Sequence, residues 1–240
     1  MTSDIAYSQW ARYYDALYAF KDYEADCRRF TDLIREHHPQ ARTLLDVACG
    51  TGKHLEILQR DFAVEGLDAN AGFLEAARAR IPGLATHHAR MEAFDLGRTY
   101  DVVTCLFSSI GFMRTREMLA AAMANFHRHL RPGGLLLVEP WFSAEIFWTG
   151  TINAHFVDQP GLKLAMMYTT AVRDGMSVLS NRIMVGTPEG IETVDEEHVL
   201  GLYTCEQYRA TIADAGFELL LSLDPQPEWK RGVHLARKRA

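Results

Sequence analysis

The stretch that decides the fold is Thr43-Leu44-Leu45-Asp46-Val47-Ala48-Cys49-Gly50-Thr51-Gly52. Its first seven residues form a nearly continuous apolar run, which predicts a strand buried on both faces, as in a parallel sheet covered by helices. Gly50 and Gly52 then predict a tight turn before a helix that begins at Lys53. A glycine turn at the carboxyl end of the first strand lets a ligand approach the backbone, so we expect a cofactor site there.

Two further positions narrow the kind of ligand. A dinucleotide fingerprint would have its third glycine at position 55, which is Leu55, so a pyrophosphate is poorly provided for at the helix start. Asp68 ends the next predicted strand, where a carboxylate can accept hydrogen bonds from two ribose hydroxyls. These positions favour a nucleoside ligand that has no pyrophosphate.

Strand and helix signals alternate along the chain, which predicts crossover units and a parallel sheet. We expect a single α/β domain with a Rossmann-like, seven-stranded, mostly parallel sheet and helices on both faces. Residues 1–38 carry aromatic side chains at helical spacing and are expected to form a helical lid. Residues 142–198 are expected to be an antiparallel β insertion, with 39–141 and 199–240 as the cofactor-binding core. The strands predicted in the insertion are 164–168, 178–185 and 194–202.

Composition disfavours several classes of protein. The 240 residues contain 25 Lys and Arg against 31 Asp and Glu, a net charge of −6, which opposes binding to nucleic acid. The chain has no run of about 18 apolar residues and opens on the polar Met1-Thr2-Ser3-Asp4, so we expect a cytoplasmic protein with no membrane partner. Four separate cysteines and the lack of an H-E-x-x-H pattern favour no metal site. A monomer or a homodimer is expected.

The stretch from Leu44 to Gly52 closely resembles the first motif of class I S-adenosylmethionine-dependent methyltransferases. The resemblance implies an enzyme that takes its methyl group from S-adenosylmethionine and releases S-adenosylhomocysteine. Four later segments look like the ribose segment, the adenine loop, the floor under the methyl group and the late turn of that family. They are Gly66-Leu67-Asp68, His88-Ala89-Arg90-Met91-Glu92, Phe107-Ser108-Ser109-Ile110-Gly111 and Arg131-Pro132-Gly133-Gly134.

Within that family, the chain looks most like bacterial N-methyltransferases of nucleotide-linked amino-deoxysugars, which include the desosamine- and mycaminose-type N,N-dimethyltransferases. This likeness implies N-methylation of a small secondary-metabolite amine, as in antibiotic biosynthesis. Alternative acceptors are an indole-derived alkaloid, another small amine or a hydroxyl group. More distant alternatives are a nicotinamide-dependent reductase and a non-catalytic nucleoside-binding protein. The likeness is carried by Phe107 to Gly111, Glu139-Pro140-Trp141 and Tyr203-Thr204-x-Glu206-Gln207-Tyr208.

The resemblance also implies the cofactor contacts. Gly50 and Gly52 are placed at the methionine part with Tyr14, and Asp68 at the ribose. Arg90 stands where related sequences often have Asp, and an arginine cannot accept a hydrogen bond from the adenine amino group. The implied cofactor-binding residues are Tyr14, Asp46, Ala48, Gly50, Gly52, Asp68, Ala69, Met91, Glu92, Leu106 and Phe107.

The chemistry of amines indicates what kind of group the acceptor site needs. An aliphatic ammonium has no free lone pair at neutral pH, so a group that takes its proton would assist methyl transfer. The resemblance implies His129 as this catalytic base, because imidazole has a suitable pKa. The competing interpretation is that His129 caps the carboxyl end of a helix. Tyr7 resembles a second catalytic hydroxyl. The implied substrate-binding residues are Ser109, Trp141, His198 and Arg231, the last at nucleotide phosphates.

Overall fold

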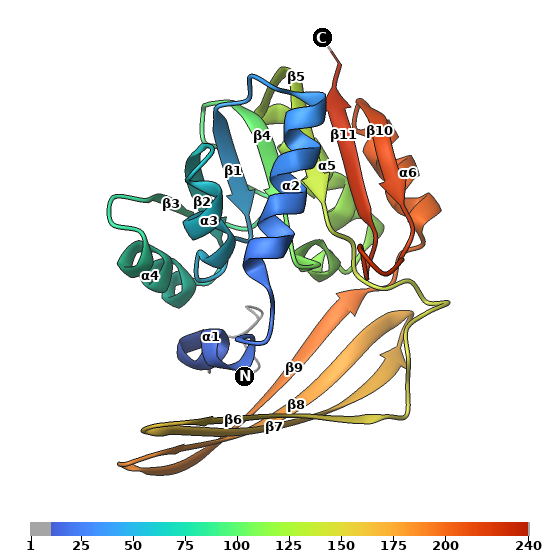
Figure 1. Ribbon diagram of the computed structural model, residues 1–240. Helices are drawn as coiled ribbons and strands as arrows, with labels where there is room; N and C mark the ends of the chain where they lie inside the picture. Colours follow the sequence, from blue (N-terminus) through green and yellow to red (C-terminus); the bar gives the residue numbers. More distant parts are fainter. Residues whose placement is uncertain (1–10, 240) are drawn as a thin grey trace.

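The computed structural model describes residues 11–239. Its larger sheet has seven strands in the order β10-β11-β5-β4-β1-β2-β3 (Figure 1). The strands β1 to β5 pair in parallel, and β11 runs antiparallel between β5 and β10. The predicted Rossmann-like, mostly parallel sheet is confirmed. Its strands are β1 (Thr43–Val47), β2 (Ala63–Asp68), β3 (Ala85–His88), β4 (Tyr100–Cys105), β5 (Leu130–Val138), β10 (Phe217–Leu223) and β11 (Val233–Lys238).

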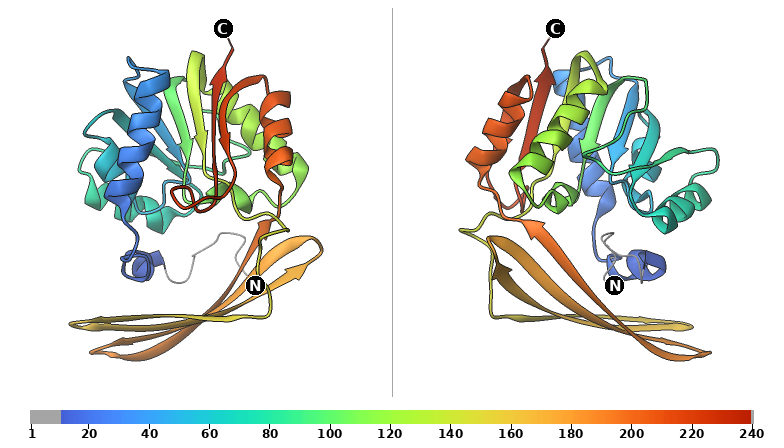
Figure 2. Two further views of the ribbon diagram at one scale, coloured as in Figure 1. Left: turned by 45° about the vertical axis from the view of Figure 1, so that its right-hand side comes forward. Right: turned by 180° about the vertical axis from the view of Figure 1, so that it is seen from behind.

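Helices cover both faces of this sheet, as predicted (Figures 1 and 2). Consecutive side chains of β1 point to opposite faces, so Leu44 packs with the helices of one face and Leu45 with those of the other. Both side chains are fully buried, which explains the continuous apolar run in the sequence. One face carries α2 (Tyr23–His37), α3 (Lys53–Leu58) and α4 (Ala71–Arg80), and the other carries α5 (Arg116–Arg128) and α6 (Cys205–Asp214).

A second sheet of four antiparallel strands follows β5 and lies below the larger sheet in Figure 1. The predicted antiparallel insertion is thereby confirmed, but its details differ. The first strand was not predicted, because its apolar residues Ile152 and Phe156 are 76% and 73% exposed and form no buried run. The last strand continues beyond the predicted boundary at residue 198. The strands are β6 (Ile152–Gln159), β7 (Leu162–Arg173), β8 (Met176–Thr187) and β9 (Gly190–Gly201).

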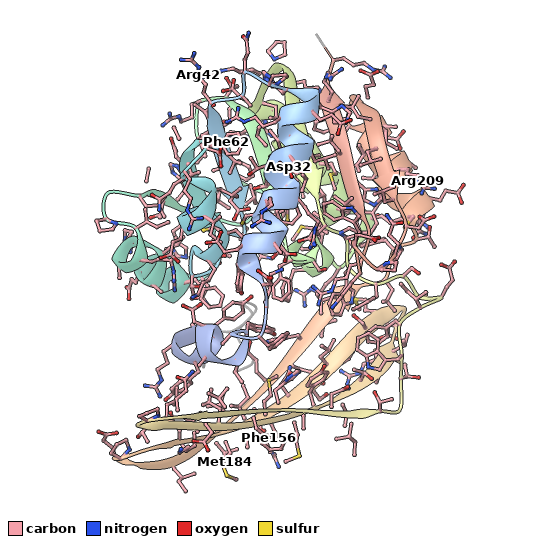
Figure 3. All side chains as sticks on the ribbon, in the orientation of Figure 1. Asp32, Arg42, Phe62, Phe156, Met184 and Arg209 are labelled. Atoms are coloured by element: carbon pink, nitrogen blue, oxygen red, sulfur yellow. The ribbon has the colours of Figure 1, made fainter. Side chains whose placement is uncertain are left out.

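The two faces of the insertion have different surroundings. Figure 3 shows Phe156 and Met184 on the side that is turned away from the larger sheet. The opposite, inner face packs against the short helices η1 (Ala11–Tyr13) and α1 (Tyr14–Leu17) near the start of the chain. The side chains in this contact are Tyr13 and Leu17 with Leu164, Met166, Ile183 and Val185.

Candidate active site

A pocket of about 390 Å³ lies at the carboxyl edge of the larger sheet. Its wall comes from the short helix α1 and the segment after it, the turns after β1, β2 and β4, and the loops that follow β3 and β5. The inner face of the insertion and the loop before β11 complete it. The pocket therefore brings together residues that are far apart in the sequence. The sequence-predicted residues that line it are Tyr14, Ala48, Gly50, Asp68, Ala69, Met91, Glu92, Phe107, Ser109, Trp141, His198 and Arg231.

The glycine turn forms one wall of this pocket. Gly50 has a φ of 56° and open space where a side chain would start, so its backbone is exposed to a ligand. Asp68 Oδ2 accepts a hydrogen bond from the Gly50 amide at 2.8 Å, and Asp68 Oδ1 accepts one from the Asn70 amide at 2.8 Å. Burial raises the pKa of the Asp68 carboxyl to about 6. A charged acceptor fixed beside an open turn suits the hydroxyls of a ribose.

Three predicted cofactor contacts lie behind this wall and do not line it. Asp46 is fully buried and accepts a hydrogen bond from the Thr104 hydroxyl at 2.7 Å, which joins β1 to β4. Gly52 has a φ of 78° at the start of α3, and a side chain there would approach Ala77 Cβ to 3.1 Å. Leu106 is buried among the α2-side core residues. These residues shape the turn by packing, a role that a motif match cannot distinguish from ligand contact.

The turn after β4 forms the floor of the pocket and has unusual backbone geometry. Phe107 and Ser108 have φ values of 52° and 65°, a region that non-glycine residues rarely occupy. The Phe107 amide donates to Glu139 Oε2 at 2.7 Å, and the Ser108 hydroxyl donates to the Pro140 carbonyl at 2.6 Å. Glu139 is the residue that sequence reasoning missed here. The sequence feature that could have indicated Glu139 is an acidic residue directly after a buried strand.

Arg90 lies beside Glu92 in the pocket wall, in the segment where the resemblance implies adenine binding. The Arg90 guanidinium forms an ion pair with Glu92 Oε1, so it serves to hold that carboxylate. Glu92 lines the pocket, and its Oε2 is buried with no hydrogen-bond partner among residues 11–239. A buried acceptor without a donor is costly, and the adenine amino group would supply one. The acceptor lost at position 90 is therefore available two residues later.

Tyr14 lines the pocket from the lid, where its ring lies 5.0 Å from that of Phe73. Burial raises the pKa of the Tyr14 hydroxyl well above its ordinary value, so the hydroxyl stays protonated at neutral pH. A protonated phenol can donate to a ligand carboxylate. Together with the open glycine turn, Asp68 and Glu92, Tyr14 completes a donor and acceptor set that suits a nucleoside bearing an amino-acid tail.

The structure places His129, which was predicted to be the catalytic base, outside the pocket wall. His129 lies at the C-cap of α5, and its ring is buried against Phe94 with centroids 4.3 Å apart. Its Nδ1 lies 2.8 Å from the Asn125 carbonyl oxygen, and its Nε2 accepts from the Leu96 amide at 2.9 Å. Both ring nitrogens are therefore bound to backbone, and His129 does not line the pocket. This position agrees with the competing interpretation, in which His129 lies at the carboxyl end of a helix. Tyr7 lies outside the described residues.

Arg231 lies on the acceptor side of the pocket. Its guanidinium carbon lies 4.9, 5.5 and 5.4 Å from the ring centroids of Phe107, Trp141 and Phe142. Within residues 11–239, no carboxylate forms an ion pair with Arg231, so stacking alone holds the cation in place. Arg114 also lines this pocket and was not predicted, because a lone arginine in a loop carries no sequence signal.

The Trp141 ring is fixed at the same place. Its Nε1–H donates to the Ser177 hydroxyl at 2.8 Å on β8, and Ser177 in turn donates to the Leu200 carbonyl at 3.1 Å. This chain of hydrogen bonds joins the loop after β5 to the insertion. An indole held in this way forms a rigid wall of an acceptor pocket.

Comparison with known proteins gives the class. Residues 44–134 match the methyltransferase domain family. Over 202 residues, the chain is 37% identical to the dTDP-3-amino-3,4,6-trideoxy-alpha-D-glucopyranose N,N-dimethyltransferase of Streptomyces venezuelae, a match that covers 83% of this chain and 85% of the relative. Over 218 residues, it is 34% identical to the dTDP-4-amino-2,3,4,6-tetradeoxy-D-glucose N,N-dimethyltransferase of Saccharopolyspora spinosa, covering 90% of this chain and 88% of that one.

Solved structures agree with this. The crystal structure of Streptomyces venezuelae DesVI superposes with a TM-score of 0.88 at 35% identity and covers 96% of this chain and 98% of its own. The S-adenosylmethionine-bound structure of CalS10, an amino pentose methyltransferase from Micromonospora echinaspora involved in calicheamicin biosynthesis, has a TM-score of 0.83 at 33% identity. That match covers 99% of this chain and 100% of CalS10.

The glycine turn, Asp68 and the seven-stranded sheet, taken with these likenesses, define an S-adenosylmethionine-dependent methyltransferase. Within that class, the chain belongs to the family that contains the nucleotide-linked amino-sugar N,N-dimethyltransferases. This membership sets aside the nicotinamide-dependent reductase and the non-catalytic binding protein. In the described part of the chain, no helix is long and apolar enough to cross a bilayer. Residues 11–239 also contain no group of three or more potential metal ligands.

Proposed function

We propose that the acceptor of this methyltransferase is the amino group of a nucleotide-linked amino-deoxysugar. The observation that carries the proposal is Arg231, a guanidinium in the pocket that is stacked on three rings and has no ion-pair partner within residues 11–239. Its planar donors match the oxygens of a diphosphate. The relatives from Streptomyces venezuelae and Saccharopolyspora spinosa are named for dTDP-linked amino sugars.

The overall charge of −6 does not exclude an acceptor that carries a diphosphate. A diphosphate responds to the groups nearest to it, because exposed charges farther than about 8 Å are largely screened at physiological salt. Arg231 lines the pocket without an ion-pair partner among residues 11–239, whereas Glu197, an acidic residue of the same wall, is paired with Arg173. The balance of charge at the acceptor side therefore favours an anion.

The proposed mechanism is an in-line displacement in which the protein positions the reactants. S-adenosylmethionine, when bound, supplies the methyl group from a positively charged sulfonium. Gly50, Asp68, Glu92 and Tyr14 would hold the donor, and the rigid turn at Phe107 would support it from below. The rings of Trp141 and Phe142, which pack edge to face, would exclude water and orient the acceptor. Such positioning is the main source of acceleration for a methyl transfer.

Substitution of Arg231 tests the acceptor. In Arg231→Gln, we expect KM for a dTDP-amino sugar to rise about 10- to 100-fold, because a bidentate charge-assisted contact is lost. Both the dissociation constant for S-adenosylmethionine and KM for the same amino sugar without its nucleotide should stay within about threefold. Arg182→Gln is the matched control, since Arg182 pairs with Asp195 on the exposed face of the insertion. An unchanged KM for the nucleotide sugar would reject the proposal.

An aromatic amine is the second candidate, because the acceptor side is rich in rings. Trp141, Phe142, Trp148, Phe112 and Tyr168 all line the pocket. A mass-spectrometric screen of methyl transfer to dTDP-amino sugars and to indole-derived amines distinguishes the two. Methylation confined to the indole amines would favour the second candidate.

Three expectations from the sequence stay predictions. They are that the acceptor is not a nucleic acid, that the protein is cytoplasmic, and that it is a monomer or a homodimer. Sedimentation would measure the oligomeric state.

A further inference from the structure

Because His129 does not line the pocket, we searched the described pocket wall for another group that could take the amine proton. Within residues 11–239, five residues of the pocket wall carry a carboxylate or an imidazole, the two kinds of side chain there that could act as a base. Three of them are carboxylates and two are histidines. They are Asp68, Glu92, Glu197, His155 and His198.

The three carboxylates are engaged elsewhere. Asp68 accepts the amides of Gly50 and Asn70 on the cofactor side, and Glu92 forms an ion pair with Arg90. Glu197 is exposed and pairs with Arg173. Each of these carboxylates is therefore held away from the acceptor side or neutralised by an arginine.

The two histidines differ in their surroundings. The His155 ring lies parallel to the exposed Phe20 ring, with centroids 5.3 Å apart, and near Tyr168 at 6.3 Å, so it is part of an aromatic stack beside a solvent-exposed ring. His198 is 5% exposed, and its Nε2 lies 3.1 Å from Glu196 Oε1. Only His198 has a carboxylate behind it in the described part of the wall.

Strand geometry explains this pair. Residues two apart on β9 point to the same face, so Glu196 and His198 both lie on the inner face of the insertion. Glu196 is 10% exposed and does not line the pocket, so it lies behind the imidazole. The His198 ring also meets the Phe112 ring edge-on at 6.2 Å. Phe112 ends the helix η2 (Ser109–Phe112), which directly follows the floor at Phe107 and Ser108.

We propose that His198 takes the proton from the acceptor amine and that Glu196 positions it. The proposal rests on the amine acceptor of the proposed function. A neutral imidazole that donates Nε2–H to Glu196 carries its lone pair on Nδ1, so the carboxylate selects the accepting tautomer. The carboxylate also stabilises the imidazolium that forms, as in catalytic His–carboxylate pairs.

The proton and electron changes balance without a further reactant. The substrate ammonium gives one proton to His198 Nδ1 and becomes a neutral amine with a free lone pair. That lone pair forms a C–N bond to the donor methyl carbon while the C–S bond breaks and its electron pair stays on sulfur. The product is a methylated ammonium. The imidazolium then releases its proton to water through the open pocket, and the base is ready for a second methyl transfer.

Among residues 11–239, the other charged or polar groups near this ring come from the segment after η2, from β8 and from β9. Arg114 follows η2, and Glu197 lies on the opposite face of β9 with Arg173. On β8, Leu179 lies opposite His198, and the neutral Asn181 donates to the Glu196 backbone carbonyl at 3.2 Å. In the described part of the chain, Glu196 is therefore the carboxylate that bears directly on the imidazole.

His198→Gln is the decisive variant, because glutamine keeps a polar side chain but cannot take a proton. At pH 7 we expect kcat/KM for the amine to fall about 100-fold, the usual contribution of a general base. The deficit should shrink to less than tenfold at pH 9, where the free amine is more abundant without assistance. Glu196→Gln should lose about tenfold, since the amide still accepts from Nε2–H but carries no charge.

His87→Gln is the matched control. It breaks another histidine–glutamate pair, His87 with Glu65 at 2.8 Å, which joins β3 to β2 outside the pocket. Its kcat/KM should stay within about threefold of the parent at every pH. A His198→Gln deficit that is equally large at pH 7 and pH 9 would indicate loss of structure, and would overturn the proposal.

A measurement without substrate separates this proposal from the proposed function. Nitrogen-15 NMR of the His198 ring at pH 8 should show protonated Nε2 and unprotonated Nδ1, with the assignment made by loss of the signal in His198→Gln. The opposite tautomer would reject the role of Glu196. If the parent enzyme methylates no amine, the proposed function fails even where the tautomer is as expected. If the parent is active and His198→Gln keeps its rate at pH 7, the base fails and the function stands.

Discussion

Asp68 shows how a single carboxylate joins the turn to the ligand. Its two oxygens fix the amides of Gly50 and Asn70, and it lies in the wall beside Ala69. Burial raises the pKa of its carboxyl to about 6, while the hydrogen bonds from backbone amides oppose that rise. The acceptor that we assign to the ribose is therefore charged at pH 8 and becomes neutral as the pH falls through 6.

Asp68→Asn should weaken S-adenosylmethionine binding about 10- to 100-fold at pH 8, because charge-assisted hydrogen bonds are lost. In the parent enzyme, the dissociation constant should be flat above pH 7 and should rise as the pH falls from 7 to 5. The variant has no carboxyl to protonate at this position, so it should lack that rise. Isothermal titration calorimetry measures both effects. Asp32→Asn, an exposed change on α2 (Figure 3), should match the parent.

Asp46 illustrates a buried carboxylate with a structural role. Burial raises its pKa to about 7, so the folded protein holds this proton to a higher pH than the unfolded chain does. The linked stability is complete below the ordinary pKa of an aspartate and is lost as the pH rises towards 7. The Asp46→Asn variant has no carboxyl that can ionise here, so it should not lose stability as the pH rises. Its amide oxygen can still accept a hydrogen bond from the Thr104 hydroxyl.

We therefore expect Asp46→Asn to raise the free energy of unfolding at pH 8 by about 1–3 kcal/mol. The gain should shrink as the pH falls from 8 to 4.5, because the parent carboxyl becomes protonated in the folded protein below about 7. Thermal unfolding followed by circular dichroism at pH 4.5, 6 and 8 measures the trend. A variant that is less stable than the parent at pH 8 would contradict the assignment.

Among the elements, the contact between the lid and the glycine turn has the most direct consequence for binding. Asp15 on α1 accepts from the Thr51 hydroxyl at 2.6 Å and forms an ion pair with Arg80 on α4. Arg80 also donates to the Thr51 carbonyl at 2.9 Å and pairs with Glu56 at 3.0 Å. Tyr14 precedes Asp15, so these bonds fix the lid residue that lines the pocket.

Asp15→Asn should weaken S-adenosylmethionine binding by about tenfold, because a half-buried charged contact that orders the lid is lost. Limited proteolysis should cut the chain before residue 22 faster in the variant, and saturating S-adenosylmethionine should slow this cleavage in both proteins. Glu24→Gln is the control, since its ion pair with Arg60 is exposed on both sides and contributes little. Equal affinity of Asp15→Asn and the parent would show that the lid is ordered without this contact.

At the scale of the whole molecule, the pocket is divided between two structural units. The larger sheet and α1 form one side of its wall, where we expect the cofactor. The insertion and the loop that carries Arg231 form the other side, where we expect the acceptor. Figure 1 shows the insertion facing the carboxyl edge of the larger sheet, with α1 between them. The two ligands should therefore protect different parts of the backbone.

Hydrogen–deuterium exchange tests this division. S-adenosylmethionine alone should slow exchange at the glycine turn, the segment from 67 to 73 and α1, because these surround the donor side. The product dTDP-amino sugar should slow exchange in β8, β9 and residues 225–232. Protection of both sets by either ligand alone would mean that the two sides close together.

The success of the fold prediction has a physical basis in local signals. An apolar run buried on both faces and a glycine turn that requires positive φ are encoded within ten consecutive residues, so β1, its turn and Asp68 were predictable. Strand β6 could not be predicted in this way, because its apolar side chains Ile152 and Phe156 are exposed and form no run of buried residues. Glu139 and Arg114 were missed because their roles depend on which loops meet at the pocket.

Two histidines show most clearly what the sequence alone could not determine. Residue order was sufficient for the methyltransferase sheet and its cofactor turn, because neighbouring residues create strands and turns. It could not decide that His129 packs into the core with both nitrogens bound to backbone, or that Glu196 lies beside His198, which the resemblance had already placed at the substrate. That choice was made when the insertion folded over the edge of the sheet, because burial and orientation come from elements that are distant in the sequence.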